Sequence, residues 1–362
     1  MNFLLPFIIS FGASLFLVPI TIFFARKYGF VDDPIKHKHP AVLHKRIIPR
    51  AGGFPIFFAF ATATLLLIPF SQKILGILLG GVTLVIIGLV DDKLNLNIGL
   101  RLLGQILAAI IVVAAGVGIA FITNPLSLFD GGLNSGVIRL DNLRVVFEFF
   151  GQHSILVWAD IFAILWIVWV INMVNFSSGV DGQMPGIVLV ALAVLFAASL
   201  RFSLNDPSQI VIFKLALIGA GATLGFLIFN FYPAKIFPGD SGSYFLGYLV
   251  AVLSILSGAK VGTAVLVMAI PLIDGVFTIV RRMASGKSPF AGDRGHLHHK
   301  LLELGWGQRR IALFYWLLCA ILGATALALN STGKLFAAIV ISIIALGGLV
   351  WLNMNLPPKA QK

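Results

Sequence analysis

Long runs of apolar residues alternate along the chain with short clusters of charged and turn-forming residues. Many runs reach about 20 residues, the length of an α-helix that crosses the hydrocarbon core of a bilayer. The runs lack the alternation of barrel strands, and a helix satisfies its own backbone hydrogen bonds in lipid. The predicted fold class is therefore all-α, a polytopic integral membrane protein with a single domain over residues 1–362. We predict eleven spans, at 3–24, 52–70, 73–90, 100–122, 156–176, 184–202, 209–231, 242–257, 261–280, 311–329 and 335–353.

The composition excludes a soluble globular protein. Of the 362 residues, 59% are apolar and 11% are charged, against about 25% charged in ordinary soluble domains. The net charge of +12 would suggest nucleic acid in a soluble chain, but here it lies between apolar runs and indicates topology first. We predict contact with the lipid bilayer and no nucleic acid. The single cysteine, Cys319, excludes an intrachain disulfide and a cysteine metal cluster.

The distribution of Lys and Arg predicts the orientation. Of 26 such residues, 19 follow odd-numbered spans or lie in the C-terminal tail, 6 follow even-numbered spans, and Lys214 lies within a span. Cytoplasmic segments are enriched in Lys and Arg, so we predict a multi-pass protein of the cell (inner) membrane, with the N-terminus outside and the C-terminus in the cytoplasm. The long outer segment, 123–155, contains an alternating stretch at 137–140 that allows a short strand.

Polar residues that carry chemistry gather on the predicted cytoplasmic side, in loops at about 25–51, 91–99, 176–184, 232–241 and 281–310. Asp91 and Asp92 end the third span. A divalent cation or a proton donor relieves the repulsion between two adjacent carboxylates, and hard oxygen ligands favour Mg²⁺. The alternative is a solvated helix C-terminus, but negative charge there opposes the helix dipole.

The fifth span ends in a polar, glycine-rich segment. Asn172 and Asn175 share one helix face, and Gly179 and Gly182 allow a tight loop that brings Asp181 and backbone amides close to a ligand. The Asn pair is also typical of hydrogen bonds between membrane helices. With the adjacent Gly-x-Asp-Gly, we favour ligand contact.

The eighth span follows the sequence Phe-Pro-Gly-Asp-Ser-Gly-Ser at 237–243. Ser241 or Ser243 would serve as an N-cap, with Asp240 favourable to the helix dipole. The same geometry presents amides to a phosphate and a carboxylate to its metal. The sequence leaves both interpretations open.

Two basic clusters complete the polar segments. After the ninth span, Asp293 and Arg294 precede the histidines at 296, 298 and 299, a set that suits a diphosphate clamp and leaves a zinc site as an alternative. The first loop contains His44 and an Arg-x-Gly-Gly sequence that begins at Arg50. Topology and anionic lipid explain part of this charge, and Arg50 is placed to hold a phosphate at the membrane surface.

These motifs make the chain resemble polyprenyl-phosphate N-acetylhexosamine-1-phosphate transferases of glycosyltransferase family 4, which are related to phospho-N-acetylmuramoyl-pentapeptide transferases. The resemblance covers about 30–310. In order, the motifs are His44 with Pro49-Arg50-x-Gly52-Gly53; Asp91-Asp92; Asn172-x-x-Asn175 with Gly179-x-Asp181-Gly182; Phe237-x-Gly239-Asp240-x-Gly242-Ser243; and Asp293-Arg294-x-His296-x-His298-His299.

The resemblance implies transfer of GlcNAc-1-phosphate or a related HexNAc-1-phosphate from a UDP-sugar donor to undecaprenyl phosphate or a similar polyprenyl phosphate, with release of UMP. Mg²⁺, or Mn²⁺ in its place, would be the cofactor. This would be the first membrane step of cell-envelope glycan synthesis, such as that of cell wall, lipopolysaccharide or teichoic acid. The sequence leaves the oligomeric state open, a homodimer included.

The resemblance also implies residue roles. Asp91, Asp92 and Asp240 would be catalytic, and with Asp181 they would bind the metal. The substrates would be held by a larger set: His44, Arg50, Asn172, Asn175, Ser178, Asp181, Asp293, Arg294, His296, His298 and His299.

One position departs from the family pattern. The family usually has Asp where this chain has Ser178. Either that carboxylate tunes the choice of donor without being needed for the chemistry, or this chain accepts a different donor.

Two other classes of protein compete with the enzyme. A transporter would have ionisable residues near the bilayer midplane and often two related halves, whereas here most ionisable residues lie at span ends. A non-catalytic scaffold would have no reason to collect carboxylates and histidines on one face.

Overall fold

The structure, a computed structural model, describes residues 4–34, 46–124, 136–148, 152–258, 260–288 and 295–355. Three of the predicted site residues, His44, Asp293 and Arg294, lie outside these ranges.

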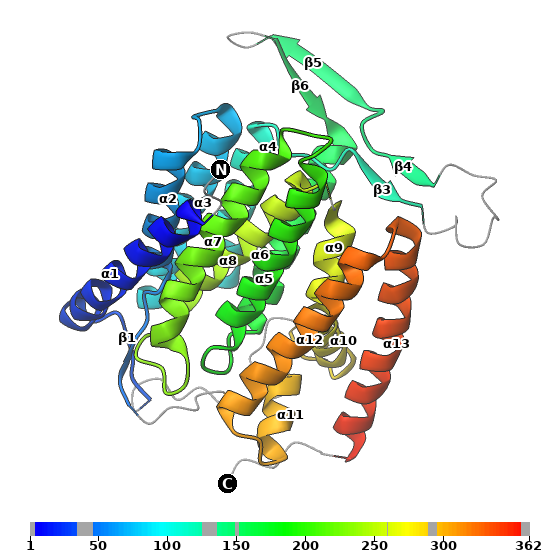
Figure 1. The fold of residues 1–362 in the computed structure, drawn as a ribbon. Coiled ribbons are helices and arrows are strands. Elements are labelled where there is room, and N and C mark those ends of the chain that lie inside the picture. The colour runs from blue at the N-terminus through cyan, green and yellow to red at the C-terminus, as the bar shows by residue number, and fades with distance from the viewer. Residues whose placement is uncertain are drawn as a thin grey trace.

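Helices dominate the described chain (Figure 1). Their bounds are α1 Leu5–Tyr28, α2 Gly53–Leu67, α3 Gln72–Leu94, α4 Ile98–Ala114, α5 Val157–Phe176, α6 Gln183–Phe202, α7 Gln209–Asn230, α8 Gly239–Leu256, α9 Lys260–Val267, α10 Ala269–Ala284, α11 Leu297–Glu303, α12 Gln308–Ala328 and α13 Ser331–Asn355.

Each of the eleven predicted apolar runs coincides with a helix, the ninth with the pair α9 and α10. Among the described residues, eight helices are long and apolar enough to cross a membrane, or nine if that bent pair is one span. The helices α2 and α4 are shorter, with 15 and 17 residues. The all-α, multi-pass prediction is confirmed, but the number of eleven spans is not. The helix α8 also begins at Gly239, earlier than predicted, which moves Asp240 from a loop into the helix.

The helix α8 forms the middle of the bundle. Every residue from Asp240 to Ser254 is buried, and α3, α5 and α2 pack around it. The Tyr248 hydroxyl donates to the carbonyl oxygens of Gly76 and Ile77 at 3.3 and 3.2 Å. Its ring occupies the space that a side chain at Gly80 would need. A small residue on α3 thus lets α8 approach closely, as is common between membrane helices.

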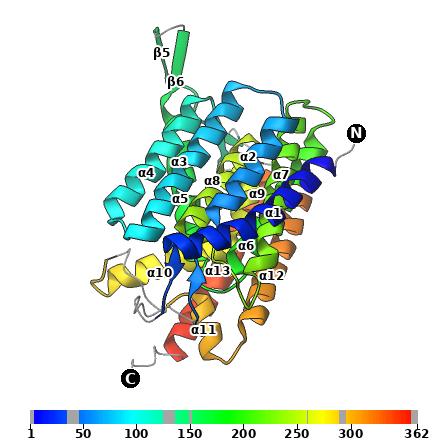
Figure 2. The same cartoon turned by 90° about the vertical axis from the view of Figure 1, so that its left-hand side faces the viewer.

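The ninth span is broken at Met268, where α9 and α10 meet at 78°. Pro271 lies one turn later and has no N–H to donate to Val267, so the helix cannot continue through this point. Figure 2 shows α10 crossing the direction of the long helices near α11. Its polar side chains Asp274, Thr278 and Arg282 are buried, and its apolar side chains Val276, Val280 and Met283 are exposed. The exposed face therefore suits lipid at the membrane interface.

Three short antiparallel strand pairs lie outside the bundle core: β1 Val31–Asp32 with β2 Ile48–Pro49, β3 Phe121–Thr123 with β4 Val137–Arg139, and β5 Arg144–Glu148 with β6 Gln152–Leu156. The predicted strand near 137–140 is confirmed as β4. The last two pairs lie at one end of the bundle, and α11 lies at the other (Figure 1).

Candidate active site

Two buried carboxylates bridged by one arginine form the centre of the site. Arg50 Nε lies 2.8 Å from Asp92 Oδ1, and Arg50 Nη2 lies 2.7 Å from Asp240 Oδ2. The Asp92 side chain is 0% exposed and that of Asp240 is 11% exposed. The planar guanidinium can bind both carboxylates at once. The contact joins the entry to α2, the end of α3 and the start of α8, which are far apart in sequence.

The charge of Arg50 is fixed by these neighbours. Burial alone would lower the pKa of Arg50, but the carboxylates of Asp92 and Asp240 outweigh it and raise the pKa above its ordinary value. The side chain therefore stays positively charged and offsets the repulsion between the two acids.

Asp92 also binds the first turn of α8. Its Oδ1 accepts the backbone N–H of Asp240 at 2.8 Å, and its Oδ2 accepts the N–H and the hydroxyl of Ser241 at 3.3 and 3.0 Å. A helix N-terminus is a natural anion site. Ser241 and Ser243 do not cap α8, because Pro238 is the N-cap residue and no side chain caps it.

Glycines allow this close approach. Gly239 has a φ of +67° and faces the Asp92 carboxylate, and Gly88 of α3 packs against the backbone of Ser241. A larger residue at either position would push α8 away from α3. The glycine spacing of the sequence therefore sets the distance between the two carboxylates.

Asp91 belongs to an adjoining cluster with its own cation. Its Oδ1 lies 2.9 Å from Arg101 Nη2 and accepts the N–H of Leu96 at 2.9 Å, and its Oδ2 accepts the Tyr244 hydroxyl at 3.0 Å. The adjacent acids at 91 and 92 thus have separate partners. The sequence predicted a divalent cation or a proton donor beside these acids; the Tyr244 hydroxyl is a proton donor to Asp91, and the divalent cation stays a prediction.

The two asparagines at the end of α5 donate hydrogen bonds to two different neighbouring helices. Asn175 Nδ2 donates to Asp240 Oδ1 and to Ser243 Oγ, each at 2.8 Å. Asn172 Nδ2 donates to Gln105 Oε1 of α4 at 2.7 Å, a hydrogen bond between membrane helices. Asn175 therefore orients a site carboxylate, and contact of Asn172 with a substrate stays a prediction.

The loop between α5 and α6 lies beside the carboxylates. Ser178 is exposed, and its hydroxyl donates to the Asn175 carbonyl at 2.6 Å. Asp181 Oδ2 accepts the backbone N–H of Ala234 at 2.9 Å. Gly182, with a φ of +75°, donates its N–H to Asn230 Oδ1 at 3.0 Å. The loop is held from several sides while Ser178 stays accessible, and the role of Asp181 as a metal ligand stays a prediction.

The histidines of the last motif meet this loop. The His298 ring lies against Gly179, where a side chain would have no room. The His296 and His298 rings stack with centroids 5.5 Å apart, and those of His298 and His299 are 4.3 Å apart. Burial, together with repulsion from His299 and His296, lowers the pKa of His298 well below its usual value. His298 is therefore a neutral hydrogen-bonding group at neutral pH.

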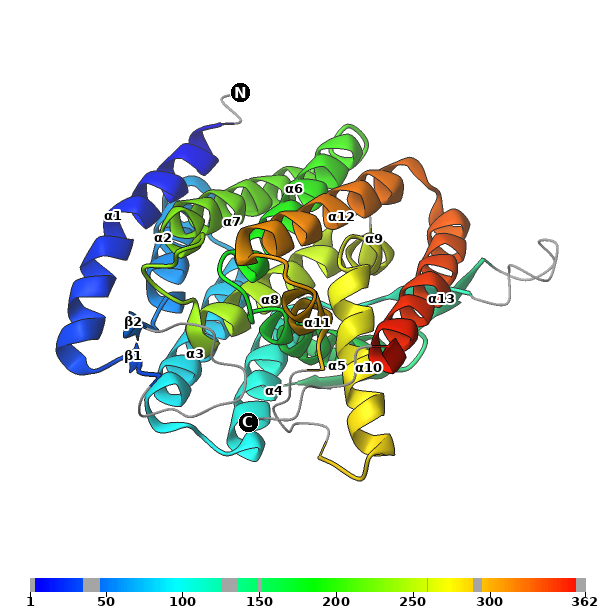
Figure 3. The ribbon, with the colours of Figure 1, turned by 90° about the horizontal axis from the view of Figure 1, so that it is seen from below.

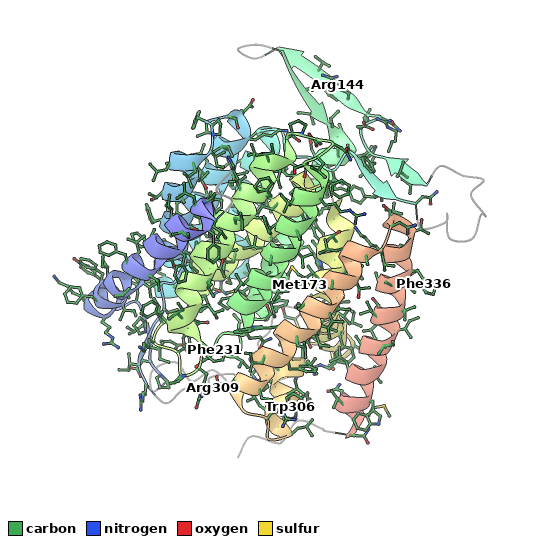
Figure 4. All side chains as sticks on the ribbon, viewed as in Figure 1. Arg144, Met173, Phe231, Trp306, Arg309 and Phe336 are labelled. Atoms are coloured by element: carbon green, nitrogen blue, oxygen red, sulfur yellow. The ribbon has the colours of Figure 1, made fainter. Side chains whose placement is uncertain are left out.

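These elements meet at the end of the bundle that carries α11. Figure 3, seen from that end, shows α8 and α11 near the centre, with α3, α5 and α10 around them. Figure 4 shows Phe231, Trp306 and Arg309 at the same end, and Met173 in the middle of the bundle. Arg309 Nε donates to the Tyr232 carbonyl at 3.0 Å. Aromatic and cationic residues of this kind are typical of a membrane–water interface.

The side chains of the site determine which metal ion it could bind. The described residues contain no group of three or more His, Cys, Asp or Glu that would hold a metal ion, which gives no support to a zinc site there. Mg²⁺ needs less from the protein, since it usually takes one or two carboxylates, water and substrate phosphate oxygens. Asp92 and Asp240 are hard oxygen donors that already share one cation, Arg50, and they fit that smaller set.

Sequence reasoning missed three partners of the site. Arg101 and Tyr244 bind Asp91, and Asp274 of α10 binds His296. Asp274 carried the clearest signal, because an acid inside an apolar run needs a partner. No spacing rule pairs it with a histidine that lies 22 residues later.

Gln183, at the start of α6, is a buried polar residue of another kind. It is 0% exposed, and neither Oε1 nor Nε2 has a hydrogen-bond partner among the described residues. A buried amide without partners costs free energy of folding. The position directly follows Gly182, so this unfavourable contribution to folding lies beside the loop between α5 and α6.

We expect Gln183→Leu to raise the free energy of unfolding by about 1 kcal/mol, because it removes two unpaired polar atoms. The measurement is the midpoint of thermal unfolding of purified protein in detergent. Gln209→Leu is the control: Gln209 is also buried, but its amide bonds Asp206, Leu256 and Gly258, so its loss should lower the midpoint. Equal destabilisation by both variants would show that Gln183 has a partner after all.

Comparison with known proteins identifies the family. The model described as "Glycosyl transferase family 4" matches residues 74–258. A "Probable undecaprenyl-phosphate N-acetylglucosaminyl 1-phosphate transferase" of Bacillus subtilis (strain 168) is 30% identical over 346 residues, which cover 93% of this chain and 88% of the relative. The chain belongs to glycosyl transferase family 4. The predicted resemblance is therefore confirmed.

Two other relatives show the breadth of family 4. A "Decaprenyl-phosphate N-acetylglucosaminephosphotransferase" of Mycolicibacterium smegmatis is 29% identical over 88% of this chain and 82% of its own length. A "Phospho-N-acetylmuramoyl-pentapeptide-transferase" of Bacillus pumilus is 28% identical over 88% of this chain and 96% of its own length. The matched region 74–258 contains Asp91, Asp92, Asn175 and Asp240, so most of the carboxylate site lies within the family's own segment.

Proposed function

We propose that this protein transfers GlcNAc-1-phosphate, or a related HexNAc-1-phosphate, from a UDP-sugar to undecaprenyl phosphate or a similar polyprenyl phosphate at the cytoplasmic face of the cell membrane. A phosphate oxygen of the lipid bonds to the phosphorus of the sugar phosphate, and the bond from that phosphorus to UMP breaks. The carrying observation is the pair of carboxylates, Asp92 and Asp240, that Arg50 bridges. Phosphoryl transfer depends on positioning and charge stabilisation, and the relatives' names support this reaction.

The chain's own residues divide into two groups around the reacting phosphates. On the donor side, Ser178, Asp181 and the histidines of α11 contact the nucleotide-sugar. Asn175 orients Asp240 through its bond to Oδ1. In this proposal Asp92 and Asp240 hold Mg²⁺, or Mn²⁺ in its place, and the bound ion supplies positive charge to the donor diphosphate. Asp91 and Arg101 lie toward the acceptor.

The acceptor approaches along α3 and α4. Val90 and Leu94 flank Asp91 in the sequence of α3, and Leu103 follows Arg101 on α4; all three apolar side chains are exposed. Arg101 itself is 33% exposed, whereas Asp91 is 0% exposed. A polyprenyl tail against these exposed side chains would bring its phosphate to Arg101, from which the buried Asp91 is one contact away.

The test is incorporation of label from UDP-[¹⁴C]GlcNAc into a lipid-extractable product, in purified protein with added undecaprenyl phosphate. We expect labelled lipid and equimolar UMP, and loss of both in EDTA that added Mg²⁺ restores. Labelled lipid without release of UMP would show that a different bond of the donor breaks. No labelled lipid with UDP-GlcNAc or any other UDP-HexNAc would overturn the proposal.

Ser178→Asp tests the position where the chain departs from its relatives. Ser178 is exposed, and among the described residues its hydroxyl bonds only the Asn175 carbonyl, so a donor could reach it without disturbing the carboxylates. We expect the donor preference or the donor KM to change more than kcat, because uniform binding changes without a matching change in the transition state. The measurement is steady-state kinetics with UDP-GlcNAc and UDP-GalNAc. A kcat raised about 100-fold with unchanged donor ranking would instead make the missing carboxylate catalytic, a gain of about 2.7 kcal/mol.

A further inference from the structure

Asp274 and His296 form a buried pair in which only the histidine has a role in the proposed function. His296 Nδ1 lies 3.0 Å from Asp274 Oδ2, and the Thr278 hydroxyl lies 3.3 Å from the same nitrogen. Asp274 Oδ1 accepts the backbone N–H of Leu297 at 2.8 Å. Asp274 and His296 are both buried, 5% and 6% exposed. One carboxylate of α10 thus binds both the ring and the first residue of α11.

We propose that Asp274 is a positioning residue that fixes the tautomer and the orientation of His296, so that the ring presents Nε2 to the donor. The identity of the donor in this proposal rests on the proposed function. The tautomer and the orientation of His296 do not depend on it. An ionised carboxylate only accepts hydrogen bonds, so the nitrogen that faces it must carry the proton. Nδ1 is then the N–H, and Nε2 is the atom that remains for a ligand.

The surroundings of the ring support this orientation. No partner for Nε2 is found among the described residues, whereas Nδ1 has two. The ring packs between Phe176, at 5.7 Å, and His298, at 5.5 Å. Phe176 is the last residue of α5, directly before the donor loop, and His298 lies against Gly179 of that loop. The free nitrogen therefore belongs to a ring that packs against the residue before this loop and against the histidine that contacts the loop.

The break at Met268 gives Asp274 its position. An unbroken ninth span would carry residue 274 along the direction of the bundle, whereas the 78° bend turns α10 across it, near α11 (Figure 2). The buried polar face of α10 then meets α5 and α11 through Asp274, Thr278 and Arg282. Among the described residues, the charged and titratable groups near His296 include Asp274, Arg282 over the Phe176 ring, Arg281, which donates to the Gly295 carbonyl at 3.3 Å, and the two histidines of α11.

Asp274→Asn tests the tautomer directly. The amide keeps the size of the carboxylate and its carbonyl still accepts the Leu297 N–H, but its NH₂ would face Nδ1 as a donor. The proton of the neutral imidazole should then move to Nε2. We expect ¹⁵N NMR of histidine-labelled protein to show Nδ1–H in wild type and Nε2–H in the variant, with the His296 signals assigned by their loss in His296→Gln. The same tautomer in both proteins would overturn the proposal.

Kinetics separate positioning from a merely structural role. We expect Asp274→Asn to lower kcat/KM for the donor at least about 30-fold when it is made in the wild-type protein. When it is made in the His296→Gln variant, we expect less than a twofold loss, because the effect of Asp274 passes through the His296 ring. Equal factors in both backgrounds would overturn the proposal. Asp160→Asn is the matched control, since Asp160 also accepts a backbone N–H, that of Leu156 at 3.0 Å, and has no hydrogen bond to a histidine among the described residues.

Two further experiments test the proposal if Asp274→Asn does not fold or if the wild type shows no activity. If Asp274→Asn does not fold, Thr278→Val takes its place, with an expected loss of about threefold that vanishes in His296→Gln; equal losses would overturn the proposal. If wild type shows no transfer with any UDP-HexNAc, the proposed function fails. The NMR result then still decides whether Asp274 fixes the His296 ring.

Discussion

Asp92→Asn is expected to reduce transfer at least about 1,000-fold, which corresponds to about 4 kcal/mol of transition-state stabilisation. Asn keeps the shape of the side chain but removes the negative charge that faces Arg50 and the first turn of α8. The NH₂ group of Asn would also face N–H and O–H groups that donate to the Asp92 carboxylate in the wild type. Asp91→Asn is expected to have a similar effect, because it removes the charge that holds Arg101 at 2.9 Å.

The measurement is the initial rate of label transfer from UDP-GlcNAc at matched amounts of folded protein. Asp141→Asn is the control, because Asp141 pairs with Arg139 at 2.7 Å in an exposed position beside β4, away from the site. We expect wild-type rates from it. Near-normal transfer by both Asp91→Asn and Asp92→Asn would remove these residues from the catalytic centre.

The apolar runs of the chain were enough to predict its long helices, but not the short, polar α11. Every predicted apolar run coincides with a helix because a backbone in lipid has few alternatives. The number of membrane crossings was not predictable in the same way. Whether α2 and α4 cross depends on their surroundings as well as their length, and the break at Met268 depends on how Pro271 interrupts the hydrogen bonds of one turn.

The candidate site was predictable where its residues are adjacent in sequence. The acids at 91 and 92 and the segment around Asp240 were recognised as separate motifs on one membrane face, and the structure brings them together through Arg50. Pairings between distant helices were not predictable. The bond from Tyr244 to Asp91 joins residues 153 positions apart, and only the packing of α8 against α3 creates it.

The same limit applies to the choice between alternatives for one motif. The sequence offered ligand contact and helix packing for the asparagines at 172 and 175; in the structure Asn172 bonds α4 and Asn175 bonds Asp240 of α8, and ligand contact of either stays a prediction. Both residues lie on one helix face, so periodicity cannot separate them. Their positions along the helix separate them, because Asn175 lies one turn closer to the end of α5, beside Asp240.

Arg50→Ala is expected to lower the free energy of unfolding in EDTA by about 3 kcal/mol or more, because it leaves two carboxylates without their shared cation. Asp92 is fully buried and Asp240 nearly so, so water cannot replace the lost positive charge. The measurement is the thermal unfolding midpoint in detergent. Arg139→Ala is the control, since it breaks an exposed ion pair with Asp141, and we expect no measurable change from it.

Addition of Mg²⁺ should separate a binding role of the carboxylates from a purely structural one. In Arg50→Ala the two acids repel each other without compensation, so a cation that binds them stabilises the folded state by mass action. We expect Mg²⁺ to raise the midpoint of the variant more than that of wild type, in which Arg50 already supplies positive charge. No shift in the variant would show that Mg²⁺ does not bind between Asp92 and Asp240. A variant as stable as wild type in EDTA would show that the pair does not depend on Arg50 at all.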